Sequence, residues 1–257
     1  MKKPIRFSRN IVLKGNTKDL EEIILKNPGR IEISRVRDMC EHNRLDMIKF
    51  LFENNHKYYI KPILITCLQY KRIDIIKYLI EVQQIDPNFK DRMDQTILYD
   101  YEDGNKWCGY FPEGVGYENE HLDYLIEKGL DINSKDKKGM TVLMRYTELN
   151  YLDKMEYLLK KNAKPDLKDN FGNTAMHYAC LHLREEAVNL LLKYGANIDV
   201  QNNTGMTPLM KSCIKYCPGF AKFMISKGAN INKRTKKGET AYDLMDYEPL
   251  KPNFYVI

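Results

Sequence analysis

The residues that could carry out chemistry in this chain of 257 residues include six cysteines and five histidines, and their spacing forms no recognised reactive site. Among the cysteines, only Cys213 and Cys217 lie as close as four residues apart, and Pro218-Gly219 follows them at once. A structural zinc site needs four ligands, usually arranged as close pairs of Cys or His. Because no second pair is present, we expect no metal and no cofactor.

Catalytic motifs are also missing from the sequence. It holds no glycine-rich phosphate loop, no Gly-x-Ser-x-Gly turn and no kinase signature. Acidic residues such as Glu185 and Glu186 fall on faces of expected helices that meet water, and no nucleophile lies beside a base. We therefore expect no enzyme activity, although a site hidden in the divergent N-terminal half stays open as an alternative.

Composition indicates where the chain works. Six scattered cysteines fall far below the density of a disulfide scaffold, which favours a reducing, cytoplasmic compartment. A nuclear location or delivery into a host cell stays open. No apolar run reaches the length of about 18 residues that a membrane helix needs, and the basic start lacks the apolar stretch of a secretory signal.

A fixed repeat must position whatever function the chain has. Four glycines recur at steps of 33 residues, and each is followed two residues later by threonine. A second phrase, usually Gly-Ala-Asn-Ile-Asp/Asn, keeps the same step. A fixed period of this length is typical of a stacked-repeat protein, which offers an extended surface rather than a closed pocket. The four glycine phrases are Gly139-Met-Thr141, Gly172-Asn-Thr174, Gly205-Met-Thr207 and Gly238-Glu-Thr240.

One repeat can be read physically from residue 136 to residue 168. Asp136 and Gly139 favour a tight turn, because Asp bonds its own backbone and Gly tolerates positive φ. Thr141 can cap a first helix over 142–149. The apolar spacing predicts a second helix over about 153–161, followed by an extended arm that leads to the next turn. The leucines of the second helices, Leu158, Leu159, Leu191 and Leu192, are expected on the inner face.

This pattern resembles the ankyrin-repeat family. The clearest copy covers 169–202 and includes Thr174-Ala-Met-His177, part of the family's Thr-Pro-Leu-His box, while another copy carries Thr207-Pro208-Leu209-Met. The resemblance implies an all-α fold, an ankyrin-repeat solenoid of stacked helix–turn–helix units with short β-hairpin-like turns. In the family the box histidine bonds neighbouring backbone, and we expect this structural role for His177. Cys40, Cys67, Cys180 and Cys213 are expected as buried thiols of first helices.

The same register divides the chain. We expect divergent N-terminal repeats over 1–93, a repeat with an aromatic and acidic insertion over 94–138 and three regular repeats over 139–237. A C-terminal capping half-repeat and tail follow over 238–257, and its first helix is expected to follow Thr240. About seven repeats result.

The resemblance implies a non-enzymatic protein–protein interaction module, an adaptor or inhibitor that binds a protein partner of unknown identity through a concave groove. A pathogen or viral factor that mimics a host adaptor is a second interpretation. Family geometry places turn-tip and first-helix residues in the groove: Lys137, Lys138, Met140, Leu149, Asn170, Phe171, Asn173, Leu181, Asn203, Met206, Ile214, Lys236 and Lys237. Ordinary solvated turns are the competing explanation for the lysines. We expect a monomer, and no membrane contact.

The insertion is the other candidate contact. Residues 99–117 hold the only Trp of the chain among further aromatic and acidic residues. Trp107, Tyr110 and Phe111 could anchor a partner, or they could fold back and fill a groove between repeats. The basic residues lack interleaved aromatics and the centre of the chain is acidic, which argues against nucleic acid as the partner.

Overall fold

The structure is a computed structural model that describes residues 7–26, 31–54, 60–90, 94, 96–99, 120–215 and 217–245. These residues form helices joined by turns, with one isolated antiparallel bridge between Lys135 and Thr141 and no named strand among them. The chain forms two compact units. The first comprises Met1–Asp91 with Thr96–Asp131, and the second comprises Arg92–Gln95 with Ile132–Ile257.

The first unit is built from helix pairs. Helix α3 packs between α1 and α5, while α4 contacts both α2 and α6, so alternate helices form two layers. This arrangement matches the helix pairs expected from the sequence. The bounds are α1 (Arg9–Lys14), α2 (Thr17–Lys26), α3 (Ile33–Glu41), α4 (Leu45–Glu53), α5 (Ile60–Gln69), α6 (Ile73–Lys77) with the π-helical turn η2 (Tyr78–Val82), the 3-10 turn η3 (Ile97–Tyr99) and α7 (Glu120–Glu127).

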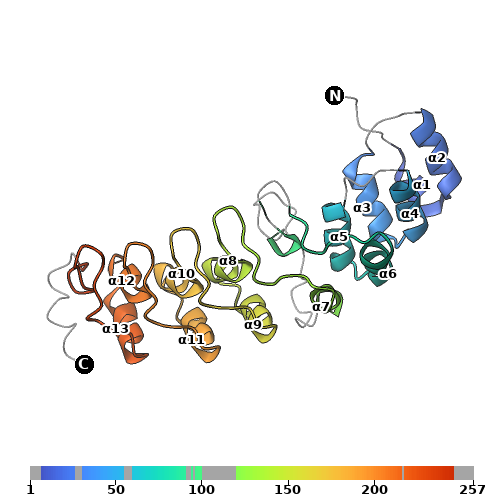
Figure 1. Ribbon diagram of the computed structural model, residues 1–257. Helices are drawn as coiled ribbons and strands as arrows, with labels where there is room; N and C mark the ends of the chain where they lie inside the picture. Colours follow the sequence, from blue (N-terminus) through green and yellow to red (C-terminus); the bar gives the residue numbers. More distant parts are fainter. Residues whose placement is uncertain are drawn as a thin grey trace. The chain divides into compact units, whose positions relative to one another are not determined.

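The second unit repeats one helix pair three times. Helix α10 packs between α8 and α12, and α11 packs against α9, so the first helices stack in one row and the second helices in another (Figure 1). The bounds are α8 (Val142–Leu149), α9 (Leu152–Lys160), α10 (Ala175–Leu181), α11 (Glu185–Lys193), α12 (Pro208–Cys213) and α13 (Pro218–Ser226). Helix α8 has the limits that the sequence predicted.

Local chemistry explains where the helices begin. Thr141 caps α8, because its hydroxyl oxygen accepts a bond from the backbone N–H of Met144. Thr207 caps α12 in the same way through Met210. Between the two helices of a pair, one residue adopts a left-handed conformation that turns the chain back. This turn occurs in both units, at Asn43, Lys71, Asn150 and Leu183, with φ between 53° and 61°.

The core lies between the two rows of helices. Leu158, Leu159 and Leu191 are buried as expected, but Leu192 is only half-buried. The expectation for Leu192 was wrong because this side chain points about 100° around the helix from the fully buried Leu191, at the edge of the packed face. The four cysteines expected in first helices, Cys40, Cys67, Cys180 and Cys213, are fully buried.

The C-terminal cap differs from the expectation. In place of a first helix after Thr240, the structure has a short turn over 241–244, held by the backbone bond from Leu244 to Thr240. A single turn leaves most backbone groups without intrahelical partners and is not sustained as a helix without further residues. The tail expected to cover the last repeat lies outside the described residues.

Candidate functional site

The four turns of the second unit are built in the same way. In the first turn, the Asp136 carboxylate accepts bonds from the backbone N–H groups of Lys138 and Met140, at 2.8 and 2.9 Å. Asp169 and Asn202 do the same in the next two turns, and the Thr235 hydroxyl does so in the last. An acceptor that holds two successive donors fixes the turn before any partner arrives.

Backbone bonds join these turns into a row. The N–H of Asn170 donates to the Lys138 carbonyl at 3.0 Å, that of Asn203 donates to Phe171 at 3.0 Å, and that of Lys236 donates to Thr204 at 2.9 Å. We call residues 136–140, 169–173, 202–206 and 235–239 the turn row. Because each turn is bonded to its neighbour, the row forms one continuous edge along the loops drawn above α8, α10 and α12 in Figure 1.

Glycine allows the turns to approach so closely. Gly172 has φ of +79°, and a Cβ on it would lie 2.6 Å from the backbone nitrogen of Asn203. Gly139 meets Asn170 in the same manner. Gly238, in the last turn, has a similar φ but no neighbouring atom within 4 Å. The repeated glycine therefore allows the positive φ that every turn requires. Where another turn follows, the absence of a side chain also lets that turn pack closely.

The predicted site residues fall into three groups. The turn-tip residues just before the glycines are exposed, and the aromatic residue among them, Phe171, is 67% exposed. On the first helices, Leu149 and Ile214 are exposed at 37% and 38%. Half-buried positions are Asn173, Leu181 and Met206. The exposed turn-tip residues are Lys137, Lys138, Asn170, Phe171, Asn203, Lys236 and Lys237.

Met140 was expected at the surface and is buried, with 7% of its area exposed. Met206, the equivalent residue two repeats further on, was also expected to be exposed and is half-buried. The cause is the turn itself, because Asp136 holds the backbone N–H of Met140 and brings the chain back beneath the tip. The residue after each of these glycines therefore lies at the inner end of the turn, next to the helix, and not at the exposed tip.

The two exposed asparagines have structural partners. Asn170 donates from its side-chain amide to the Lys137 carbonyl at 2.9 Å, and Asn203 donates to the Asn170 carbonyl at 2.9 Å. The side-chain nitrogen of each asparagine is the donor in these bonds. The side-chain oxygens of Asn170 and Asn203 lie next to Gly139 and Gly172 of the adjoining turns. Trp107, Tyr110 and Phe111 lie outside the described residues, so the contact predicted for the insertion stays a prediction.

The second unit, which carries the turn row, has a net positive charge. Its residues 132–245 contain 19 lysines and arginines against 11 acidic residues. In the turn row itself, Asp169 is buried and accepts from two backbone amides and the Tyr178 hydroxyl. Burial and the bond to Asp169 raise the pKa of Tyr178. The Tyr178 hydroxyl and the Asp169 carboxylate therefore stabilise the turn and do not face solvent as charges. The outward-facing charges are therefore those of the lysines.

His177 is buried beneath the turn row, and both of its ring nitrogens are hydrogen-bonded. Its Nδ1 accepts from the backbone N–H of Thr174 at 3.1 Å, so the proton sits on Nε2, which donates to the Met206 carbonyl at 3.0 Å. Burial lowers the pKa of His177 to about 4. This arrangement confirms the expected backbone role and leaves no base available to a substrate. Among the described residues no cluster of His, Cys, Asp and Glu could hold a metal ion.

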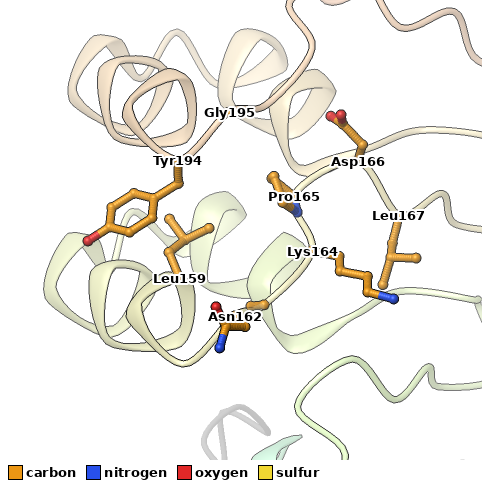
Figure 2. A pocket seen from close by; sticks show the side chains of 9 residues that line it. Leu159, Asn162, Lys164, Pro165, Asp166, Leu167, Tyr194 and Gly195 are labelled. Carbon is orange, nitrogen blue, oxygen red and sulfur yellow. The ribbon is translucent and has the colours of Figure 1, made fainter.

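A cavity of about 630 Å³ opens elsewhere on the second unit, where α9 and α11 end (Figure 2). Apolar side chains form much of its wall, and no buried charge points into it. Its nearby carboxylate, Asp166, is used by the backbone N–H of Asn197 at 3.0 Å. We assign no chemistry to this cavity, which is lined by Leu159, Asn162, Ala163, Lys164, Pro165, Asp166, Leu167, Tyr194 and Gly195.

Comparison with known families agrees with the geometry. The family described as ankyrin repeats in three copies matches residues 115–202 and 185–245, which together cover more than half of the chain. The chain belongs to the ankyrin-repeat family. Ankyrin repeats generally serve as protein–protein interaction modules. No curated protein matches the chain, and none of the described helices is long and apolar enough to cross a membrane.

Sequence reasoning missed a second set of links between the ankyrin repeats. The side chains of Asn133, Asp166 and Asp199 each accept a bond from a backbone N–H 31 residues later. Lys135 and Lys168 each donate to a carbonyl 33 residues later. Their recurrence at the repeat step was the available signal, since a polar residue kept at one register position has a neighbour at the same position in the next repeat.

Proposed function

We propose that the chain is a non-enzymatic adaptor or inhibitor that binds a protein partner through the turn row and the adjoining first helices. Phe171 is the single observation that carries the proposal, since it is 67% exposed on an edge whose backbone is otherwise fixed by hydrogen bonds. Leaving a large aromatic ring in water is unfavourable, and aromatic residues contribute strongly to binding at interfaces.

Two further apolar side chains support this role. Leu149, at the end of α8, and Ile214, directly after α12, are also partly exposed. Apolar groups rimmed by amides and lysines are typical of interaction surfaces. Because Asp169 and Asn203 already hold the Phe171 turn, little conformational entropy remains to be lost on binding.

Catalysis has less support. Ankyrin-repeat proteins are typically non-enzymatic. His177 is neutral and bonded on both nitrogens, and burial raises the pKa of the Cys213 thiol to about 12, which disfavours the reactive thiolate. The described residues therefore supply a binding surface more readily than a reactive group.

The experiment compares binding by the full chain and by a Phe171→Ala, Met206→Ala double variant. A partner is first captured on the immobilised full chain from the native cell extract and identified, and its affinity is then measured by calorimetry. We expect a loss of at least about tenfold with an unchanged melting temperature, because hot-spot truncations cost about 2 kcal/mol or more. Met206→Ala keeps the backbone carbonyl that accepts from His177.

Leu25→Ala is the matched control, because Leu25 is 73% exposed but belongs to the first unit. Its affinity should equal that of the unaltered chain. Retention of full affinity in the double variant, or equal losses in the control, would place the interface away from the turn row.

A further inference from the structure

Basic residues are distributed unevenly along the turn row. Lys137 and Lys138 occupy the tip of the first turn, and Lys236 and Lys237 occupy the tip of the last. All four side chains are exposed, and none of the four forms an ion pair with another described residue. The two turns between them carry neutral tips, and Phe171 is at the tip of the second turn, one repeat step from the first lysine pair and two steps from the last.

The carboxylates of the row do not neutralise this edge at its surface. Asp136 and Asp169 point inward and accept backbone N–H bonds, and Glu239 accepts from the Thr235 hydroxyl at 3.0 Å. Their charges are thus directed into the turns, whereas the lysines extend into water. A partner approaching the row meets positive charge at both ends and an apolar ring between them.

The distance between the two lysine pairs sets the length of a ligand that could contact both of them. Three repeat steps separate the pairs, since each step is 33 residues. Packed helices lie about 8–10 Å apart, so three steps amount to roughly 24–30 Å. An extended peptide advances about 3.3 Å per residue, and roughly eight residues would cover this distance.

We propose that the turn row binds an extended acidic protein segment in which two acidic clusters, about eight residues apart, flank an apolar side chain that contacts Phe171. This inference rests on the proposed function and specifies the chemistry of the partner. Acidic groups meet the lysine pairs at the ends of the row, and charge complementarity fixes the register of the segment.

A nucleic acid fits the row less well than such a peptide. Its backbone carries charge at every nucleotide, with one charge per about 1.7 Å of duplex axis, and would leave the phosphates over the two neutral turns without partners. The ring of Phe171 instead calls for an apolar residue at one place. Duplex DNA is therefore included in the test as the competing ligand.

The test uses fluorescein-labelled peptides and the full chain. The first peptide holds Asp-Asp and Glu-Glu pairs about eight residues apart, with leucine about one third of the way from one pair to the other. The second has the same composition with the acidic pairs adjacent, and the third has alanine in place of the leucine. We expect the first peptide to bind tightest by fluorescence anisotropy, and its affinity to fall as salt rises, since exposed charges are screened.

Paired variants locate the contact. Lys137→Gln with Lys138→Gln, and Lys236→Gln with Lys237→Gln, should each weaken the first peptide by roughly three- to tenfold, as expected for two exposed ion pairs. Lys160→Gln with Lys193→Gln is the control, because it removes the same charge from the second helices beside Glu156. Phe171→Ala should lower affinity for the leucine peptide and not for the alanine peptide.

Several outcomes would overturn the inference. They are equal affinity for the spaced and adjacent acidic pairs, an equal effect of the control lysines, no binding of any acidic peptide, or tighter lysine-dependent binding of duplex DNA. Panning random peptides displayed on phage against the full chain separates the two claims. Selected peptides that lack acids yet lose binding to Phe171→Ala would end the acidic-segment inference and leave the proposed function standing, whereas selected peptides indifferent to Phe171 and the lysine pairs would end both.

Discussion

His177 and Met206 are joined by a partly buried hydrogen bond of 3.0 Å from the imidazole Nε2 to the backbone carbonyl, which ties one ankyrin repeat to the next. The residues equivalent to His177 in the repeats on either side are Met144 and Met210. Their sulfurs accept from the backbone N–H groups of Thr141 and Thr207 at 3.4 Å and so complete the helix cap within the repeat. A methionine side chain has no second polar atom that could also bond the next repeat. The repeats thus differ in how firmly they are joined.

Stability should depend on pH through His177. Burial lowers its pKa from 6.5 to about 4, so between these values the unfolded chain binds a proton that the folded chain does not. The free energy of unfolding should therefore be full above about pH 6.5 and fall by about 3 kcal/mol as pH decreases to about 4. Urea unfolding across this range, compared between the unaltered chain and His177→Met, isolates the contribution from that of the carboxylates. Parallel pH profiles for the two proteins would contradict the prediction.

Adding the missing histidine should strengthen the last junction. In Met210→His, Nδ1 would accept from Thr207 and Nε2 would face the Glu239 carbonyl, which already accepts from Thr235 as the Met206 carbonyl does from Asn202. One added buried hydrogen bond is worth about 1 kcal/mol, and the gain should disappear at acidic pH. Thermal unfolding measures it, and Met210→Leu, which removes the sulfur without adding a donor, is the control. A lower melting temperature for Met210→His than for Met210→Leu would count against this geometry.

Two glycines should respond differently to alanine. Gly172→Ala and Gly238→Ala place a side chain at nearly the same positive φ, which costs about 1 kcal/mol in each. Only Gly172 has the backbone of a following turn, at Asn203, within 2.6 Å of the added carbon. We expect Gly172→Ala to lower the free energy of unfolding by clearly more than Gly238→Ala, measured by urea titration. Equal losses would mean that conformation alone, and not stacking, requires the glycine.

Adjacent leucines provide a test of the helix register. Leu191 is fully buried, whereas Leu192 is half-buried. Truncation of Leu191 to alanine should cost about 2–5 kcal/mol, and truncation of Leu192 should cost less because part of its surface is already in water. Differential scanning calorimetry of the two variants would decide, and an unchanged melting temperature for Leu191→Ala would show that the register is misplaced.

Much of the repeat could be predicted from the sequence because glycine, threonine and leucine recur where backbone chemistry requires them. Helix 142–149 and the cap at Thr141 follow from such local rules. Met140 could not be placed in this way, because its burial depends on the path that the Asp136 bonds impose on the turn. The expected helix after Thr240 is a short turn over 241–244, and the register alone predicts where a helix could start but not how far it continues.

For the site, the sequence predicted which turn positions are exposed, but not how many of their polar groups are already used. Asn170 and Asn203 bond neighbouring turns, and this requires knowledge of which carbonyl lies opposite each amide. The turn-tip lysines Lys137, Lys138, Lys236 and Lys237 differ, because their side chains form no ion pair with another described residue.

Hydrogen exchange of the full chain, free and bound to its tightest protein partner, tests the central claim most directly. Binding at the turn row predicts slower amide exchange in residues 136–149, 169–181, 202–214 and 235–239, with little change in α9, α11 and α13. Slower exchange confined to α9, α11 and α13, with the turn row unchanged, would contradict the account.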